Sequence, residues 1–171
     1  RFAEWNYGPQ KRPLVSAQLN LFPKKKGLYK GTITVAFQTI EESRIQRKFT
    51  SLNRETQKEN VQVWSLNGDF EVKKTPSNSL SYGFEVIHNE IKSEAFAQEL
   101  RVIENQVSSL SAALPIPTRY PSDGSSYASQ ALYSNFRYDL NPKTSLSLGG
   151  RFTATTLKAR WKDNGLLLSD F

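Results

Sequence analysis

The stretch Thr32-Ile33-Thr34-Val35-Ala36-Phe37-Gln38 alternates between polar or small side chains and large apolar ones. Successive side chains of a β-strand point to opposite faces, so this pattern places Ile33, Val35 and Phe37 on one side of a sheet. Five further runs repeat the alternation, whereas no long apolar series at helical spacing with caps is present. The sequence therefore predicts an all-β protein with about six strands. We expect them at residues 13–22, 31–40, 61–72, 80–89, 127–140 and 145–161.

The connections between these strands alternate in length. Pro23–Lys30, Lys73–Ser79 and Asn141–Thr144 are short and rich in turn-forming residues, whereas 41–60 and 90–125 have the length of long loops. Outer-membrane barrels alternate in this way, with tight periplasmic turns and long extracellular loops, and ~9–11 tilted residues are enough for a strand to cross the bilayer. The pattern favours an antiparallel up-and-down meander of transmembrane strands.

Composition narrows the classes of protein further. The chain has 171 residues, with 23 Lys+Arg against 16 Asp+Glu, a formal net charge of +7 and no cysteine. The lack of cysteine excludes a disulfide scaffold, a thiolate zinc site and a cysteine nucleophile. No run approaches the ~18 consecutive apolar residues that a spanning helix needs. The chain opens on Arg1 without a methionine or a signal-like segment, and we interpret it as an internal piece of a longer polypeptide.

Alternation alone does not say whether the apolar face contacts lipid or a dry core, because both give the same period. Several aromatic residues near strand ends fit an interfacial girdle, although they could equally cap a soluble core. They are Phe22, Tyr29, Trp64, Tyr138 and Trp161. In the barrel interpretation, Ile33, Val35, Phe37, Phe84 and Leu148 face lipid, while Gln18, Asn20, Asp69, Glu85 and Arg151 face inwards.

Four segments resemble the β-barrel part of TonB-dependent outer-membrane receptors, in particular those of the haem, haemoglobin and transferrin type. The most specific is Gln38–Phe49, QTIEESRIQRKF, in which a strand continues into charged residues. Glu4–Arg12, Thr118–Ser125 and Gly149–Thr153 are also similar to that family and occur in its order. The resemblance spans nearly the whole chain, and the order and spacing of the segments are more specific than any one of them.

The resemblance implies that residues 1–171 are a partial barrel of this family, whose barrels have 22 strands around a plug domain. It also implies a function, TonB-energised uptake of a scarce nutrient such as an iron complex (a siderophore or haem) across the bacterial outer membrane. The implied partners are the remaining strands, the plug, and the TonB complex through a region outside this sequence. Two other functions stay open: a small soluble β-barrel that binds an apolar ligand, and an outer-membrane barrel enzyme.

Catalytic chemistry has little support in the residues. Any Ser-His-Asp relay would have to pass through His88, the single histidine. Asp69 and Glu85 lie on the polar faces of adjacent predicted strands and could form an acid/base pair, but lumen-lining charges explain them better. The sequence therefore predicts no enzyme, no catalytic residue and no metal site.

His88 is the one side chain considered as a cofactor ligand, because some members of the resembled family carry haem. It shares its parity with Leu80, Tyr82, Phe84 and Val86, which places it on the apolar face near the membrane surface. We interpret it as an interfacial histidine, with axial haem ligation as the alternative. We predict no resident cofactor, and the ligand-binding residues stay unknown.

The two long loops are candidates for outside contacts. The segment 41–60 mixes cationic and acidic side chains, which are typical of a solvated loop but could also contact lipid and the phosphates of lipopolysaccharide. The segment 90–125 turns apolar from Val107 to Ile116, which fits a loop that folds over the lumen, touches a ligand or packs on neighbouring loops. Basic residues are interleaved with acids, so nucleic acid is not an expected partner.

Overall fold

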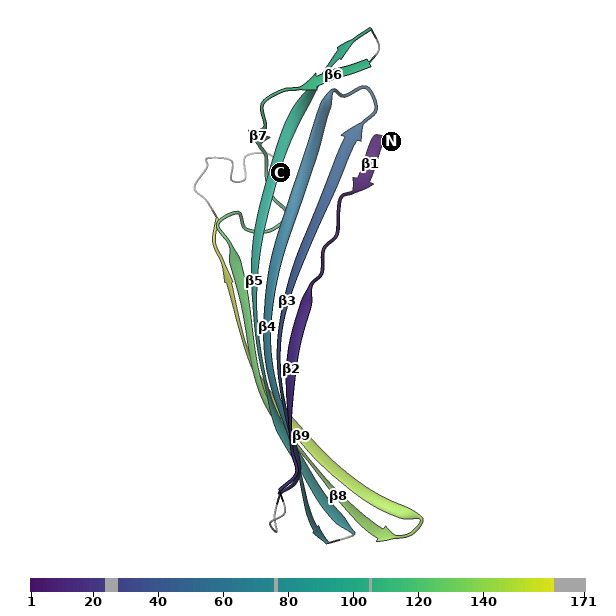
Figure 1. Cartoon of the computed structure of the whole chain (residues 1–171), viewed down its shortest axis with the longest axis vertical. Helices are drawn as coiled ribbons and strands as arrows, with labels where there is room; N and C mark the ends of the chain where they lie inside the picture. The colour runs from purple at the N-terminus through teal and green to yellow at the C-terminus, as the bar shows by residue number, and fades with distance from the viewer. Residues whose placement is uncertain (24–27, 76, 105, 162–171) are drawn as a thin grey trace.

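A computed structural model describes residues 1–23, 28–75, 77–104 and 106–161, which form a tall, curved sheet of antiparallel strands (Figure 1). No described residue is helical, so no described helix could cross a membrane. The strands are β1 Phe2–Tyr7, β2 Leu14–Leu21, β3 Leu28–Lys48, β4 Asn53–Thr75, β5 Asn78–Ile103, β6 Gln106–Leu110, β7 Leu114–Pro115, β8 Ser125–Asn141 and β9 Thr144–Ala159.

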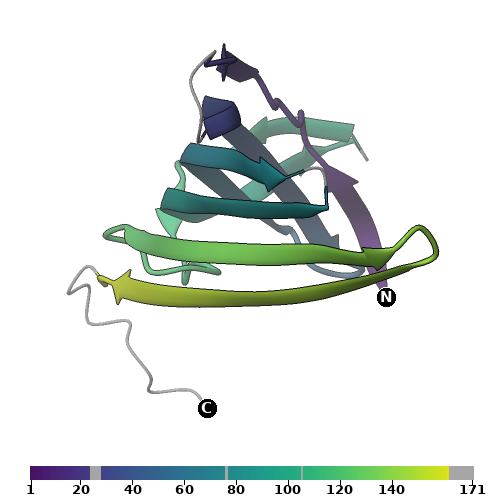
Figure 2. The same ribbon diagram turned by 90° about the horizontal axis from the view of Figure 1, so that it is seen from below.

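The sheet has the order β1-β3-β4-β5-β8-β9, and every pairing is antiparallel. β2 also pairs with β3, so β1 and β2 occupy two successive lengths of the same edge, while β6 and β7 pair with the far end of β5. The six predicted strands therefore form the predicted meander in chain order. β2 and β9 lie on opposite edges and do not pair with each other within the described part, so the sheet is open (Figure 2).

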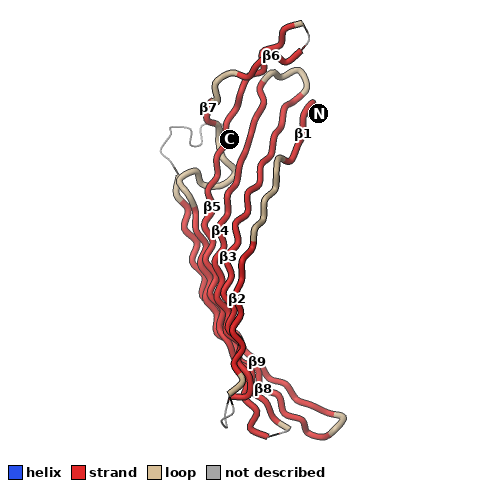
Figure 3. The backbone as a smooth tube through the Cα atoms, viewed as in Figure 1, coloured by secondary structure: helices blue, strands red, loops and turns tan. Residues whose placement is uncertain are grey.

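The prediction that 41–60 is a long loop is wrong. β3 and β4 remain paired from Leu28↔Val72 to Gln46↔Glu55, and only Phe49–Leu52 separate the two strands. The expected loop is the far half of a long hairpin (Figure 3). The error has a physical cause, because charged residues occupy both faces here and the apolar alternation disappears although the backbone ladder continues.

The prediction of one long loop over 90–125 is wrong for the same reason. β5 continues to Ile103, β6 folds back on it, and β7 pairs with Phe96–Ala97. Within the described part of this segment, the residues outside strands are 104, 111–113 and 116–124. The apolar run from Val107 to Ile116 thus contributes to two short strands.

Three strands are much longer than a bilayer requires. β3, β4 and β5 contain 21, 23 and 26 residues, compared with the ~9–11 that cross the hydrocarbon layer. Of the predicted turns, Asn141–Thr144 joins β8 to β9 as a tight hairpin in which Asn141 pairs with Thr144. Within the other two, residues 24–27 of Pro23–Lys30 and residue 76 of Lys73–Ser79 lie outside the described residues.

The sheet is a single layer with almost no core. Among the described residues, the only buried hydrophobic side chains are Ala95, Leu100 and Ala131. A globular domain of this length would bury most of its large apolar side chains against a second layer. Whatever stabilises the apolar residues of this sheet therefore contacts them from outside the described chain.

Candidate functional site: two chemically opposite faces

The strand register brings the apolar residues together on one side, here called the apolar face. One row crosses all six strands, from Leu19 through Ile33, Gly68, Phe84 and Leu132 to Phe152. The Phe84 ring fills the gap at Gly68, since a Cβ built on this glycine would lie 2.4 Å from the ring. Neighbouring rows hold Val15, Ala17, Val35, Phe37, Trp64, Leu66, Phe70, Leu80, Tyr82, Val86, Phe136, Tyr138, Leu146 and Leu148.

The apolar face is open along its length. Trp64 is 50% exposed, Phe152 73% and Leu148 74%, and no described segment covers them. Rings on this face contact one another, as in the pair Phe37–Trp64 with centroids 4.2 Å apart. The predicted set Ile33, Val35, Phe37, Phe84 and Leu148 thus shares one face as expected, and none of its members is buried.

The opposite side, here called the polar face, carries a connected polar row. This row runs Asn20, Thr32, Asp69, Gly83, Tyr133 and Arg151. Thr32 donates to Asn20 Oδ1 at 3.1 Å, the Tyr133 hydroxyl donates to Asp69 Oδ1 at 2.5 Å, and the Arg151 guanidinium lies 5.5 Å from the centre of the Tyr133 ring. The predicted inward set Gln18, Asn20, Asp69, Glu85 and Arg151 therefore shares one face, as expected.

Gly83 makes this row continuous. A Cβ at position 83 would lie 2.5 Å from the Tyr133 hydroxyl and 2.4 Å from the carbonyl oxygen of Gly68. Without a side chain on β5 at this point, Tyr133 on β8 reaches across to Asp69 on β4. Asp69 and Glu85 do not pair with each other, because Glu85 accepts a hydrogen bond from Arg151 Nη2 at 2.6 Å.

The polar face also holds buried polar atoms without a partner. Six such atoms occur in the described structure, and five of them belong to residues of the polar face by strand register. These five are Arg44 Nε, Glu59 Oε1, Asn67 Oδ1, Asn89 Oδ1 and Ser93 Oγ. Polar atoms removed from bulk water normally form hydrogen bonds, so this face is suited to ordered water or to a polar partner.

At the far end of β3, Arg44 joins segments that are distant in the sequence. Its guanidinium carbon lies 5.3 Å from the Trp5 ring centre and 5.4 Å from that of Tyr7, so Arg44 contacts two aromatic rings of the paired strand β1 on the polar face. On the other face, Arg54 Nε donates to both carboxylate oxygens of Glu4, at 3.1 and 3.2 Å. The sequence did not predict β1 or these contacts, because they depend on how β1 and β4 align with β3, and the pattern of a single strand does not encode that alignment.

Glu59 lies beside Arg44 in the same part of the polar face. Burial raises the pKa of the Glu59 carboxyl above its ordinary value of 4.5, while the positive charges of Arg119 and Arg44 oppose that change. Arg119 belongs to the stretch between β7 and β8. Because its charge acts on Glu59, this stretch lies close to the part of β4 that carries Glu59. Three of the four segments that carry the family resemblance contribute to this area.

His88 occupies the predicted position on the apolar face. It pairs in register with Trp64 on β4 and Ala128 on β8, and its Nε2 lies 3.4 Å from Glu90 Oε1. Among the described residues, no group of three or more His, Cys, Asp or Glu side chains could hold a metal ion. His88 therefore has one carboxylate neighbour, Glu90, and lies in the same row as Trp64 on the apolar face.

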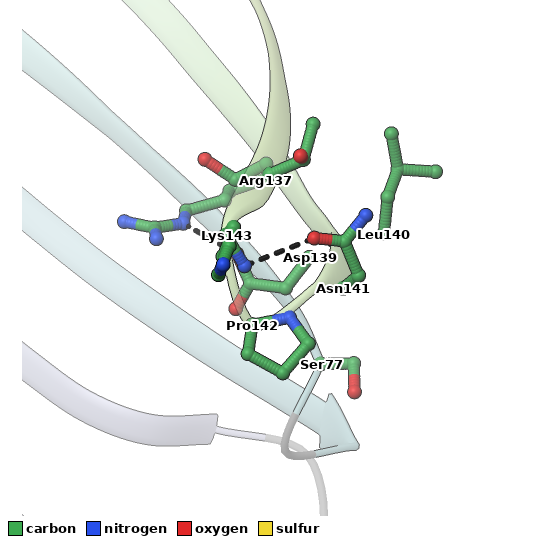
Figure 4. A pocket seen from close by; sticks show the side chains of 9 residues that line it. Ser77, Arg137, Asp139, Leu140, Asn141, Pro142 and Lys143 are labelled. Carbon is green, nitrogen blue, oxygen red and sulfur yellow. Dashed lines mark hydrogen bonds and ion pairs between the residues drawn. The ribbon is translucent and has the colours of Figure 1, made fainter.

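Hollows lie at the two opposite ends of the β8–β9 pair. One, of about 460 Å³, is formed by the β8–β9 turn, where Arg137 contacts Asp139 at 3.0 Å and the Lys143 amide donates to Asn141 Oδ1 at 2.9 Å (Figure 4). These contacts hold the hairpin turn itself. The other hollow, of about 240 Å³, lies where β8 begins and β9 ends, beside residues 90–92 in the middle of β5. It is lined by Glu90, Ile91, Lys92, Asp123, Gly124, Ser125, Ser126, Lys158 and Arg160.

The sequence matches no protein-family model and no curated protein, and no solved structure matches the fold. The function is therefore inferred from the two faces of the sheet and from its rims.

Proposed function

We propose that this chain is part of the wall of a larger outer-membrane β-barrel, a TonB-dependent receptor that takes up a scarce nutrient such as an iron complex. The apolar face contacts lipid and the polar face lines the lumen. The family and the energy coupling come from the resemblance of the four sequence segments. The membrane location is supported by the sheet itself.

The observation that carries the proposal is the exposed apolar face on a single-layer sheet. Soluble monomers rarely expose a continuous apolar patch of more than a few hundred Å². Here the apolar rows cross six strands and have no described cover. A transmembrane barrel requires this arrangement, with lipid on the apolar side and water or a plug on the polar side.

The open edges support a larger barrel over a small soluble one. Backbone groups at a sheet edge have no water partners in the hydrocarbon layer, so a spanning sheet must close. In the described chain β2 and β9 are separate edges, and closure needs further strands. The unpartnered polar atoms on the polar face are consistent with a polar plug or water in the lumen.

In this arrangement the ligand arrives at the rim formed by the long ends of β3, β4 and β5. The opposite rim consists of short turns, which face the periplasm in outer-membrane barrels. The β5–β6 hairpin extends past Leu100, whose amide makes the last bond to the β4 side, at Leu52. Its exposed residues Val102, Ile103 and Val107 are therefore presented to the outside.

Uptake by the full-length protein tests the proposal. Deleting its gene in the parent bacterium should abolish uptake of one radiolabelled siderophore or of haem, and restoring the gene should recover it. Replacing 102–109 by a two-glycine turn keeps the Leu100↔Leu110 pair, and should weaken surface binding while leaving heat-modifiable migration of the barrel intact. A protein that purifies from the soluble fraction would contradict the proposal.

A further inference from the structure

The hollow beside β5, β8 and β9 combines three cations that have no ion pair within the described chain. Lys92, Lys158 and Arg160 line it, whereas the seven ion pairs of the described structure involve other basic residues. Two acids, Glu90 and Asp123, line the same hollow, so its cations outnumber its acids by three to two. The hollow therefore has an excess of positive charge available to an anion.

The strand register places the Lys92 and Lys158 side chains on the apolar face. Lys158 pairs with Ser126, which pairs with Glu90, and all three have the same parity as His88 and Phe84. Lys92 follows His88 by four residues on β5, so it lies ~13 Å farther along the strand, or roughly 9 Å along the membrane normal at a tilt near 45°. The row with Trp64 opposite His88 lies between these cations and the apolar rows that cross the six strands.

This height matches the level of lipid phosphates. The hydrocarbon core is ~30 Å thick and the whole bilayer ~40–45 Å, so the headgroup layer extends ~5–8 Å beyond each side of the core. With Trp64 and His88 at the boundary of the hydrocarbon, the three cations stand in or just above that layer. Each cation near an anionic membrane surface strengthens attraction to it, and Ser126, which pairs with Lys158, adds a hydroxyl donor on the same face.

We infer that the hollow lined by Lys92, Lys158 and Arg160 binds a phosphate group of the glycolipid of the outer leaflet, lipopolysaccharide. The inference rests on the proposed function, since it needs the apolar face to contact the outer membrane. It assigns the lipid contact to the hollow beside β5, β8 and β9, whereas the sequence pointed to the charged segment 41–60. The apolar rows below the hollow are positioned to contact the acyl chains of the same molecule.

The test uses the full-length protein and two triple variants that remove equal charge. Lys92→Gln, Lys158→Gln and Arg160→Gln empty the hollow of cations, while Lys30→Gln, Lys48→Gln and Lys143→Gln remove three exposed cations at other levels. Binding of purified lipopolysaccharide and of its dephosphorylated form is measured by native mass spectrometry in detergent. The first variant should lose at least about tenfold in affinity for the phosphorylated form, and the second less than twofold.

Two results separate the inference from the proposed function. If the protein migrates as a heat-modifiable barrel and the first variant binds phosphorylated lipopolysaccharide as tightly as the parent, the phosphate site is refuted and the barrel stands. If the parent does not assemble into bilayers, both fail. Displacement of the glycolipid by millimolar inorganic phosphate would assign the hollow to a free anion and also overturn the lipid site.

Discussion

Arg151 on β9 donates a hydrogen bond from Nη2 to Oε1 of Glu85 on β5, 2.6 Å away, although β8 lies between the two strands. Ala131 on β8 lies opposite Glu85 in the register and is only 3% exposed. A small side chain at position 131 thus lets the ion pair pass over the central strand. The contact ties three strands together on the polar face.

Glu85→Gln and Arg151→Gln, singly and together, measure this coupling. Because both side chains are partly exposed, 45% for Arg151 and 31% for Glu85, we expect a coupling free energy of only about 0.2–1 kcal/mol. The measurement is urea unfolding of the full-length protein in lipid bilayers. Strictly additive effects of the two substitutions would show that the contact contributes no stability.

Gly83 gives a sharper test of the polar row. Gly83→Ala introduces a Cβ that collides with the Gly68 carbonyl and the Tyr133 hydroxyl, so Tyr133 must leave Asp69. We expect a loss of about 1–3 kcal/mol in the free energy of unfolding. Gly150→Ala is the matched control, because a Cβ at position 150 meets nothing within 4 Å. Equal stability of the two variants would refute the close approach of Tyr133 to β5.

The alternating rows were predictable from the sequence, and the connections across them were not. Val35 and its neighbours signal their face through local periodicity, which each strand carries by itself. The reach of Tyr133 to Asp69 depends on the register of three strands and on a glycine between them, and no local pattern encodes it. The long ends of β3 and β4 escaped prediction because Glu41 and Glu42 place carboxylates on both faces at once.

Glu59 predicts a dependence of stability on pH. Since its pKa is higher in the folded protein than its ordinary value of 4.5, the folded state binds a proton more tightly than the unfolded state. The unfolding free energy should therefore fall as pH rises above about 4.5, until the folded carboxyl has also ionised. Glu59→Gln should remove this loss and stabilise the protein at pH 7 but not at pH 4.

Thermal unfolding of the full-length protein between pH 4 and pH 8 measures this effect. Glu94→Gln is the control, because Glu94 is an exposed carboxylate at a similar level on the other face. If Glu59→Gln lowers the free energy of unfolding at pH 7 relative to this control, the buried carboxylate of Glu59 does not destabilise the folded protein, and the predicted pH dependence is wrong.

Arginine scanning distinguishes the two faces energetically. Val35 and Gln18 lie at nearly the same depth, since Val35 pairs with Ala17. Val35→Arg should cost about 2–4 kcal/mol and impair assembly in bilayers, because it places a guanidinium in the hydrocarbon layer. Gln18→Arg places the same group in the lumen and should cost much less. Equal tolerance of both substitutions would reverse or remove the assignment of the faces.

The central claim is that the apolar face contacts lipid, and site-specific quenching tests it most directly. The chain contains no cysteine, so Val35→Cys and Thr34→Cys introduce single labelling sites on opposite faces at adjacent positions. With a bimane label on the full-length protein in bilayers, brominated lipid should quench position 35 and aqueous iodide should quench position 34. A label at position 35 that brominated lipid leaves unquenched would contradict the account.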